Sequence, residues 1–481
     1  DGLTATAKAK SLARAPIFIV ARVFLKNWGV SLVEFEDLKT KIGSGEIDTV
    51  LTCIVDMQGR LMGKRFHAEA FLEIADGETH CCNYLLATDL EMATPNGYAS
   101  TSWQGGYGDY VMQPDLSTLR PVPWLEGTAM CLCDVMDHPT PEPVPHSPRE
   151  MQQKQLARAA ALGLTPDKAT ELEIYQLQGT HDEIAQNGYA LKPISNYNED
   201  YHIFQTTKEE YVMRPIRNHL RKMGLPVEGS KGEAEAGQEE LNLKYAEALA
   251  CADNHTLAKH GVKEIAHQHG VAASFLPKWH KDRVGSASHV HQSLWSGGAN
   301  AFFDPDRPHG KSELMDHYVA GLMTYAADYT CFMAPYVNSY KRFAKGTFAP
   351  TQVVWSIDNR TAAFRLCGEG SKAVRIECRV PGADMNPYLA QAAMLAAGLK
   401  GIEEKLRLPE VFAGDAYADD DKKHIPHTLR DAREALLASE MLREAFGDEV
   451  VMHYARAAEW EIEEFNRVVT DYEISRGLEK A

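Results

Sequence analysis

Apolar and polar residues alternate in short runs over the first third of the chain. The runs at 49–56, 82–86 and 128–134 are strand-like, and turn-forming residues separate them. Five prolines follow between residues 137 and 149. Because proline lacks a backbone donor and favours extended chain, this stretch indicates a join between two regions. We therefore predict a small mixed β region at 30–136, followed by a second region of different character.

The second region combines longer apolar patterns of helical spacing with shorter strand-like runs. Helices are predicted at 151–164, 208–224, 241–260, 313–340 and 386–406, and throughout 425–476. Strands are predicted at 169–177, 353–357, 363–366 and 373–380. Antiparallel strands interleaved with helices are typical of the α+β fold class, which we predict for this chain.

Three strand-like stretches each carry two polar or charged residues at positions i and i+2. The pairs are Glu171 and Glu173, His289 and His291, and Glu377 and Arg379. Residues two apart on a strand point to the same face. A single pair of this kind is also typical of a solvated outer face. Three pairs on three strands favour a sheet curled into a barrel or funnel, with the pairs gathered around one cavity.

The segment 232–240 (GEAEAGQEE) adds further carboxylates. Its glycines and small residues indicate a close turn, and Glu233 and Glu240 could converge from a loop and a helix start. Carboxylates combined with an imidazole suit Mg²⁺ or Mn²⁺ better than Zn²⁺. A pair of such cations would neutralise the phosphate oxygens of a nucleotide. The sequence has no GxxxxGK(S/T) motif, so a P-loop would not hold that nucleotide.

Arginines form a basic set within an acidic chain. They are Arg342, Arg360, Arg365, Arg375 and Arg379. The planar guanidinium group binds carboxylate and phosphate through two parallel hydrogen bonds. Surface charge balance is the alternative explanation for each arginine alone. Their alternation with apolar strand residues favours a role in binding.

The composition narrows the classes of function. The 481 residues carry a net charge of −17, with 44% apolar and 24% charged residues. Such a chain is expected to fold around a sizeable core and to repel nucleic acid and anionic membranes, so neither is expected as a partner. The nine cysteines form no CxxC pair, which indicates reduced thiols, and we expect a cytoplasmic location. The basic run 8–26 is similar to a transit peptide, but we interpret residues 1–30 as an N-terminal extension.

Eight motifs carry a resemblance to a known family. They are DMQGRLMGKRF (56–66), GYGDYVMQPDLSTLRPVPW (106–124), TELEIY, GEAEAGQEE, HVHQSLW, YVNSYKRF, DNRTAAFR and RIECRVPGADMNPYLA. Taken in order, they resemble the glutamine synthetase superfamily in its bacterial class I form. The resemblance implies an N-terminal β-grasp domain at 31–140 and a catalytic α/β barrel domain at 141–481. It also implies a homo-oligomer with active sites between subunits, a dodecamer of two stacked hexamers.

The resemblance also implies roles for individual residues. Glu171, His289 and Glu377 match the ligands of a looser metal ion, and Glu173, Glu233 and Glu240 match those of a tighter one. ATP would bind at Glu228, His291, Ser293, Arg365, Lys372 and Arg375, and glutamate at Gly285, His289, Arg342 and Arg379. Arg360 and Arg365 match the arginines that hold the transferred phosphoryl group. The cofactors implied are two to three Mg²⁺ or Mn²⁺ ions per active site, with ATP as a substrate.

The sequence departs from glutamine synthetases in the flap that follows the YKR motif. Glutamine synthetases carry a glutamate there that helps to hold and deprotonate ammonium, and Phe348 stands in its place. An apolar side chain favours an amine with a carbon substituent. Tyr201 matches an amine-pocket tyrosine, and Asp89 matches the ammonium-site aspartate contributed by a neighbouring subunit. Val284 stands where the family has an asparagine of the glutamate site.

The whole pattern resembles the γ-glutamyl amide ligases of amine catabolism. Such an enzyme moves the γ-phosphoryl group of ATP to the γ-carboxylate of L-glutamate, and a primary amine then displaces phosphate. Arylamines, alkylamines, hydroxyalkylamines and polyamines are the amines that the resemblance implies. The alternatives are an authentic glutamine synthetase that uses ammonium, an ATP-dependent enzyme acting on another acid or a guanidino acceptor, and a non-catalytic scaffold of the same fold.

Overall fold

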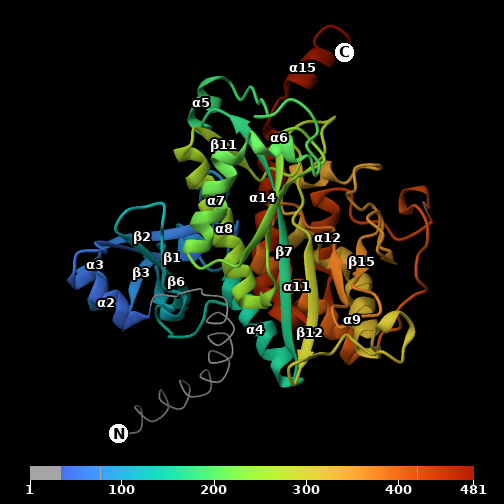
Figure 1. The fold of residues 1–481 in the computed structure, drawn as a ribbon, viewed down its shortest axis with the longest axis horizontal. Coiled ribbons are helices and arrows are strands. Elements are labelled where there is room, and N and C mark those ends of the chain that lie inside the picture. Colours follow the sequence, from blue (N-terminus) through green and yellow to red (C-terminus); the bar gives the residue numbers. More distant parts are fainter. Residues whose placement is uncertain (1–33, 76, 420) are drawn as a thin grey trace.

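Two β-sheets organise the chain (Figure 1). The computed structural model describes residues 34–75, 77–419 and 421–481, so the extension predicted at 1–30 lies outside the described residues. The strands of the smaller sheet lie between residues 49 and 137, and those of the larger sheet begin after the proline-rich join at 137–149. Arg149 connects the two parts, because its buried guanidinium pairs with Asp134 of the smaller sheet and with Asp253 beyond the join.

The smaller sheet has six strands in the order β2-β1-β6-β4-β3, with β5 paired to β6. Their bounds are β1 Thr49–Val55, β2 Leu61–His67, β3 Thr79–Cys82, β4 Asp109–Pro114, β5 Arg120–Pro121 and β6 Thr128–Asp137. β1 and β6 run parallel, and the other pairs are antiparallel. The helices α2 (Phe35–Gly43) and α3 (Ala68–Ile74) pack their apolar side chains on this sheet. The strands predicted at 49–56 and 128–134 are confirmed.

The strand predicted at 82–86 is wrong. β3 ends at Cys82, and Asn83–Leu86 form a short 3₁₀ helix, η1. Cys82 is opposite Asp109, the first residue of β4, and the pairing ends one residue later, where the Asn83 N–H donates to the carbonyl oxygen of Gly108 at 2.9 Å. The side-chain amide of Asn83 also donates a hydrogen bond to the carbonyl oxygen of Ser100 at 3.2 Å. This contact anchors the segment that leads back to β4.

The larger sheet has ten strands in the order β14-β15-β16-β12-β7-β9-β8, with β10 and β11 paired to β7 and β13 paired to β12. Their bounds are β7 Thr165–Gln178, β8 Val227–Gly232, β9 Gln238–Leu243, β10 Ala246–Glu247, β11 Val271–Ser274, β12 Val290–Ser296, β13 Ala299–Asn300, β14 Trp355–Ile357, β15 Phe364–Cys367 and β16 Arg375–Cys378. The first half of β7 pairs with β12 and its second half with β9. β7 and β12 therefore run side by side through the centre of the molecule (Figure 1).

Helices cover this sheet and supply most of the core. Their bounds are α4 Pro148–Ala161, α5 His181–Gln186, α6 Ile203–Thr207, α7 Glu210–Lys222, α8 Ala248–Gln268, α9 Glu313–Thr324, α10 Ala326–Met333, α11 Pro387–Glu403, α12 Leu429–Ala438, α13 Glu440–Phe446, α14 Asp448–Arg467 and α15 Asp471–Gly477. Short 3₁₀ helices lie at η2 Leu116–Thr118, η3 Pro308–Gly310, η4 Val337–Arg342 and η5 Ala416–Ala418. α11 is buried along almost its whole length and forms the centre of the largest core cluster.

The helices predicted at 151–164, 208–224 and 386–406 are confirmed, whereas three other predictions had wrong boundaries. The predicted helix 241–260 begins only at Ala248, because 238–243 and 246–247 are strands and the Glu247 side chain caps the helix start. The predicted helix 313–340 divides into α9, α10 and η4. The predicted helix 425–476 is four helices, divided at Ser439, at Gly447, whose φ of 99° ends α13, and at Thr470.

Alternation along β7 explains how the sheet separates core from site. Leu172 and Ile174 are buried against apolar residues of α7 and α8, such as Ile216 and Val262. Because neighbouring strand residues point to opposite faces, the intervening glutamates face away from that core. Among the residues that the structure describes, no helix is long and apolar enough to cross a membrane.

Candidate active site

The first cluster, which we call the mixed triad, consists of Glu171, His289 and Glu377. Donor atoms of the three side chains lie within 4.8 Å of one another. Glu377 of β16 is opposite His291 of β12, which aligns the two strands that carry the cluster. Glu171 Oε2 lies 2.8 Å from His289 Nδ1, and Glu171 Oε1 lies 2.9 Å from His291 Nε2. One carboxylate on β7 therefore bridges both histidines of the HVH motif.

The second cluster, the carboxylate triad, consists of Glu173, Glu233 and Glu240, whose donor oxygens also lie within 4.8 Å of one another. Glu240 lies on β9, directly opposite Glu173 of β7. The expectation that Glu240 starts a helix is therefore wrong, because the ladder with β7 continues past it to Asn242. Glu233 follows β8 at the turn into β9. The turn predicted from small residues is what brings Glu233 back beside the strand.

The side chains of the two triads are not a solvated outer face. Glu377 is 0% exposed and Glu173 is 7% exposed, and Glu240 and His289 are also buried. Glu171 and Glu233 are half-buried. Burying this many ionisable groups is costly unless they are paired or hold a cation. The surface interpretation of the strand pairs is therefore wrong, and the clusters need compensating charge.

The protein itself supplies compensating charge to the mixed triad. Arg379 Nη1 lies 2.5 Å from Glu377 Oε1, and Arg365 Nη1 lies 2.9 Å from Glu377 Oε2. Burial acts to raise the pKa of Glu377, but the charges of Arg379 and His289 outweigh it and lower the pKa to about 2. Burial likewise opposes ionisation of Glu171, but its hydrogen bonds with two histidines hold its pKa well below the ordinary value.

The carboxylate triad has far less compensation. Burial and the charge of Glu233 raise the pKa of Glu173 to about 8. Burial and the charge of Glu171 raise the pKa of Glu240 to about 8. Lys231 is the neighbouring cation: it pairs with Glu233, and its Nζ lies 3.8 Å from Glu240. The raised pKa values show that one ammonium group does not balance the negative charge of three carboxyl groups.

The donor sets fit hard divalent cations. Five carboxylates and one imidazole form two sets of three, and oxygen-rich sets of this kind suit Mg²⁺ or Mn²⁺. The ammonium group of Lys231 acts as a stand-in cation between two of the carboxylates. Each triad leaves coordination positions for water and phosphate oxygens, which is how Mg²⁺ is usually held. The residues present therefore fit the metal ions that the sequence implied.

The five predicted arginines differ in their surroundings. Arg365 and Arg379 contact the mixed triad through Glu377, and Arg365 Nε also donates to Asp358 Oδ1 at 3.0 Å. Arg375 Nε donates to His291 Nδ1 at 3.2 Å. The side chain of Arg360 is exposed, and its backbone carbonyl accepts a hydrogen bond from Arg379. Surface charge balance is therefore wrong for Arg379, which is buried, while Arg360 lies at the surface of this chain.

Gly285 and Arg342, predicted for the glutamate site, lie against each other. A Cβ at position 285 would come 2.8 Å from Arg342 Cγ and 2.5 Å from the carbonyl oxygen of Pro277, so only glycine fits there. The buried guanidinium of Arg342 donates to the carbonyl oxygens of Val380 at 2.8 Å and Arg379 at 3.0 Å. Burial lowers its pKa to about 10, against the opposing charge of Glu173.

Three residues predicted for nucleotide binding lie at the edges of this arrangement. Ser293 lies on β12 two residues beyond His291, and its hydroxyl accepts a hydrogen bond from the Trp295 indole at 3.0 Å. Glu228 on β8 and Lys372 before β16 are both exposed. The structure brings none of these three side chains into contact with either triad.

The structure does not bring the residues predicted for the amine site close together. Phe348 is 54% exposed and Tyr201 is 67% exposed, and both adopt positive φ angles, of 57° and 55°. The Tyr201 ring lies 4.8 Å from Lys231 Nζ, which connects it to the carboxylate triad. The backbone carbonyl of Phe348 accepts from Arg379 at 3.4 Å. Asp89 lies elsewhere: its Oδ2 accepts a hydrogen bond from the Trp460 indole at 2.9 Å.

Sequence reasoning missed three residues of the site. Lys231 contacts two carboxylates. It lies on a strand, two residues before Glu233, and that spacing is the signal that could have found it. Gln238 donates from Nε2 to the carbonyl oxygen of Gly285 at 3.1 Å and so holds the segment before the HVH motif. The Cys367 thiol lies 3.5 Å from Glu377 Oε2. Nothing in the spacing of the cysteines indicated that contact.

Residues 145–477 match the glutamine synthetase catalytic domain. The chain therefore belongs to the glutamine synthetase family, as the order of its motifs predicted.

Two curated relatives have names that are more specific than the family description. The chain is 44% identical over 448 residues to a gamma-glutamylethanolamide synthetase of Streptomyces coelicolor, with 92% of this chain and 96% of the relative covered. It is 36% identical over 439 residues to a glutamate–isopropylamine ligase of a Pseudomonas species, with 90% and 95% covered. Among solved structures, it is similar to GmaS in an ADP complex, with a TM-score of 0.81 and 28% identity over 92% of this chain and 99% of that one.

Proposed function

We propose that the protein is an ATP-dependent ligase that joins the γ-carboxylate of L-glutamate to a primary amine, giving a γ-glutamyl amide, ADP and phosphate. The observation that carries the proposal is the pair of triads on adjacent strands, with Arg365 bonded to one of them. Likeness to an ethanolamide synthetase and an isopropylamine ligase supports an amine as the acceptor. The first step in amine degradation is the proposed physiological role.

The first chemical step is phosphoryl transfer. An oxygen of the glutamate γ-carboxylate attacks the γ-phosphorus of ATP, the bond to ADP breaks, and γ-glutamyl phosphate forms. Arg360 and Arg365 are the proposed ligands of the transferred phosphoryl oxygens, and Arg342 and Arg379 would orient the glutamate. Magnesium held by the two triads would neutralise charge on the phosphate oxygens.

The second step is aminolysis. The amine nitrogen attacks the acyl carbon, the bond between that carbon and the phosphate oxygen breaks, phosphate leaves, and the nitrogen loses a proton. Phe348 supports a substituted amine, because an exposed apolar ring gains by covering a carbon group and cannot hold an ammonium ion as a glutamate would. Tyr201 and Asp89, the latter from a neighbouring subunit, are the further residues proposed for the amine.

The finer assignments complete the proposal. We propose two to three Mg²⁺ or Mn²⁺ ions per active site and nucleotide contacts from Glu228, His291, Ser293, Lys372 and Arg375. The proposed architecture is a β-grasp domain at 31–140 before a barrel-type catalytic domain at 141–481, assembled as a dodecamer of two stacked hexamers in the cytoplasm. The location of Asp89 away from both triads of its own chain supports active sites shared between subunits.

A phosphate-release screen tests the function. The protein is incubated with L-glutamate, ATP, Mg²⁺ and one acceptor from the set aniline, isopropylamine, ethanolamine, putrescine and ammonium. We expect release that requires both glutamate and a substituted amine, with a γ-glutamyl amide detected by mass spectrometry. Ammonium as the best acceptor would favour an authentic glutamine synthetase. Release with no acceptor in the set, by protein that binds Mg²⁺ and ATP, would contradict the proposal.

A further inference from the structure

A lysine completes a row of charged side chains across three strands of the larger sheet. Lys231 of β8 lies directly opposite Glu240 of β9, and Glu240 lies directly opposite Glu173 of β7. Residues that face each other on antiparallel strands point to the same side of the sheet. The ammonium group of Lys231 therefore lies on the face that carries the carboxylate triad.

This ammonium group takes the position of a cation in the triad. Its Nζ pairs with Glu233 and lies 3.8 Å from Glu240 Oε1. A divalent cation such as Mg²⁺ binds carboxylate oxygens at about 2.0–2.1 Å, so it would need the same oxygens. Two cations a few ångströms apart also repel each other. A metal ion and the ammonium group in its present position therefore exclude each other.

Lys231 can leave its triad more easily than the arginines of the mixed triad can. Arg379 Nε is also bonded to the carbonyl oxygen of Arg360 at 3.2 Å, and Arg365 Nε is bonded to Asp358 Oδ1 at 3.0 Å. Lys231 has a flexible four-carbon stem, and among the described residues its side chain donates no hydrogen bond outside the triad. The side chain is 23% exposed, so it reaches solvent. Its displacement breaks hydrogen bonds with the triad alone.

Tyr201 offers the displaced ammonium group a second partner. The centre of its ring lies 4.8 Å from Lys231 Nζ. The backbone N–H of Tyr201 donates to the carbonyl oxygen of Gly232 at 3.3 Å, which holds the ring beside the end of β8. An aromatic face attracts an ammonium ion that lies within about 6 Å of its centre. The ammonium group can therefore leave the carboxylates and keep its contact with the ring.

We propose that Lys231 is a built-in counter-ion of the carboxylate triad, which the tighter metal ion displaces toward Tyr201. In the metal-free protein, the lysine offsets part of the negative charge of the triad. Because this pairing is lost when a metal ion binds, the lysine lowers the affinity of the triad for that ion. The inference rests on the proposed function for the metal ion at this triad. It adds a residue that sets the metal affinity and moves toward the proposed amine site.

Calorimetric titration of Mn²⁺ into metal-free protein, without ATP, glutamate or amine, tests the proposal. Lys231→Met removes the charge and keeps the length of the side chain. It should lower the Kd of the tighter ion by about tenfold, because the ion no longer displaces a paired cation. The Kd of the looser ion should not change. Lys231→Arg keeps the charge and should bind the tighter ion no better than the native protein does.

Two further variants locate the effect. Lys222→Met makes the same change at the exposed last residue of α7 and should leave both Kd values at their native level. In a Glu233→Gln background, Lys231→Met should change the Kd less than it does in the native protein, because the lysine has already lost a charged partner. An equal change in both backgrounds would overturn the proposal.

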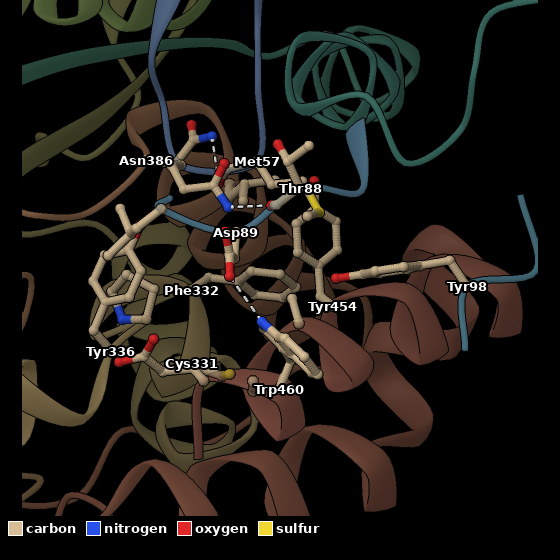
Figure 2. Close-up of a pocket in the computed structure, with 17 residues that line it drawn as sticks. Met57, Thr88, Asp89, Tyr98, Cys331, Phe332, Tyr336, Asn386, Tyr454 and Trp460 are labelled. Carbon is tan, nitrogen blue, oxygen red and sulfur yellow. Dashed lines mark hydrogen bonds between the residues drawn. The ribbon is translucent and has the colours of Figure 1, made fainter. Parts of the chain in front are cut away.

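A third control concerns carboxyl groups outside the triads. Asp89 and Glu461 line a cavity of about 60 Å³, in which the Trp460 indole donates a hydrogen bond to Asp89 at 2.9 Å (Figure 2). None of the residues that line this cavity belongs to either triad. Glu461→Gln should therefore leave the Kd of the tighter ion unchanged. A weaker tight site in this variant would place that ion in the cavity and overturn the proposal.

Equal or weaker binding of Mn²⁺ by folded Lys231→Met would also overturn the proposal. The direction of the change is informative, because loss of a merely structural side chain would weaken binding. Circular dichroism shows whether the variant is folded. If it is not, crystals of the native protein with Mn²⁺ decide: Lys231 Nζ should have left both glutamates, and an ammonium group that stays on them beside the bound ion would contradict the proposal.

The experiment also separates this inference from the proposed function. If Lys231→Met binds Mn²⁺ more tightly but the native protein forms no amide with any amine, the proposed function is contradicted and this inference stands. If the native protein forms an amide but Lys231→Met leaves the Mn²⁺ affinity unchanged, this inference is contradicted and the proposed function stands.

Discussion

The two triads lie on neighbouring strands and both contain buried carboxyl groups, yet their electrostatics differ. In the mixed triad, Glu377 is paired with Arg365 and Arg379, and its pKa is lowered to about 2. In the carboxylate triad, Glu173 and Glu240 have pKa values raised to about 8 with Lys231 as the partner cation. One triad is neutralised by the protein itself, and the other needs an added cation.

This difference in charge balance predicts that the two triads bind a cation with different affinity. A cluster whose charge is already balanced gains less from a cation, whereas unbalanced carboxylates gain more because binding relieves their repulsion. The comparison gives a physical reason for a tighter ion at the carboxylate triad and a looser ion at the mixed triad. It also predicts different effects on stability, since two arginines pair with Glu377 of the mixed triad, whereas a single lysine pairs with the carboxylate triad.

The largest expected effect is on turnover. Glu240→Gln removes a proposed metal ligand with little change in shape, and we expect phosphate release to fall by about 100-fold or more, given that residues merely supporting a ligand contribute 10–100-fold. Glu69→Gln, on the exposed face of α3, is the matched control and should have native activity. The assignment of Glu240 would be untenable if its variant turned over within a few-fold of the control.

The second prediction compares how a substitution in each triad changes the free energy of unfolding. In metal-free protein, Glu377→Gln leaves Arg365 and Arg379 without their buried partner, and we expect a loss of about 3 kcal/mol in the free energy of unfolding. Glu240→Gln removes a repelling charge and should leave the free energy unchanged or raised. Urea unfolding in the presence of EDTA measures both. Equal losses in the two variants would contradict the comparison.

The third prediction concerns the free energy that cations contribute. A ligand that binds only the folded state at 100 times its Kd stabilises by about 2.7 kcal/mol. Mg²⁺ at such a concentration should therefore raise the thermal midpoint of the native protein. Glu233→Gln should reduce that rise more than Arg375→Lys, which lies beside His291 and outside both triads. If the thermal midpoint of the native protein did not change with Mg²⁺ or Mn²⁺, that result would count against both metal assignments.

The smallest effect is expected at a position outside both triads. Phe348→Glu should lower kcat/KM for isopropylamine by about tenfold, since burying an aliphatic group is worth about 1.5 kcal/mol, and should improve the use of ammonium. Phe348→Leu keeps apolar surface and is the control. Metal affinity should be the same in both variants. Unchanged kinetics with both amines would remove Phe348 from the proposed amine pocket.

The sequence predicted the sheet-borne part of the site because strands impose a period of two. Glu171 and Glu173 alternate with Leu172 and Ile174, and that alternation alone assigns them to one face. The spatial grouping depends on register, such as Glu377 opposite His291, which a local pattern does not encode. The order of the family motifs supplied that information.

The loops were harder to predict for a physical reason. Tyr201 and Phe348 lie in turns with positive φ, where no periodic pattern relates a residue to its neighbours in space. Helix boundaries also depended on tertiary contacts: the segment predicted as one helix at 241–260 begins as strand because β7 offers a pairing partner. Lys231 was missed because a charged residue on an exposed strand looks like a solvated one until its partners are placed.

Crystals of the protein grown with Mn²⁺ and ADP and measured by anomalous diffraction test the central claim most directly. We predict two manganese peaks, one within about 2.0–2.5 Å of donor atoms from Glu173, Glu233 and Glu240 and one at similar distances from Glu171, His289 and Glu377. When the manganese concentration is lowered, the peak at the carboxylate triad should persist after the peak at the mixed triad has weakened. Manganese bound only elsewhere, or at neither triad, would contradict the account.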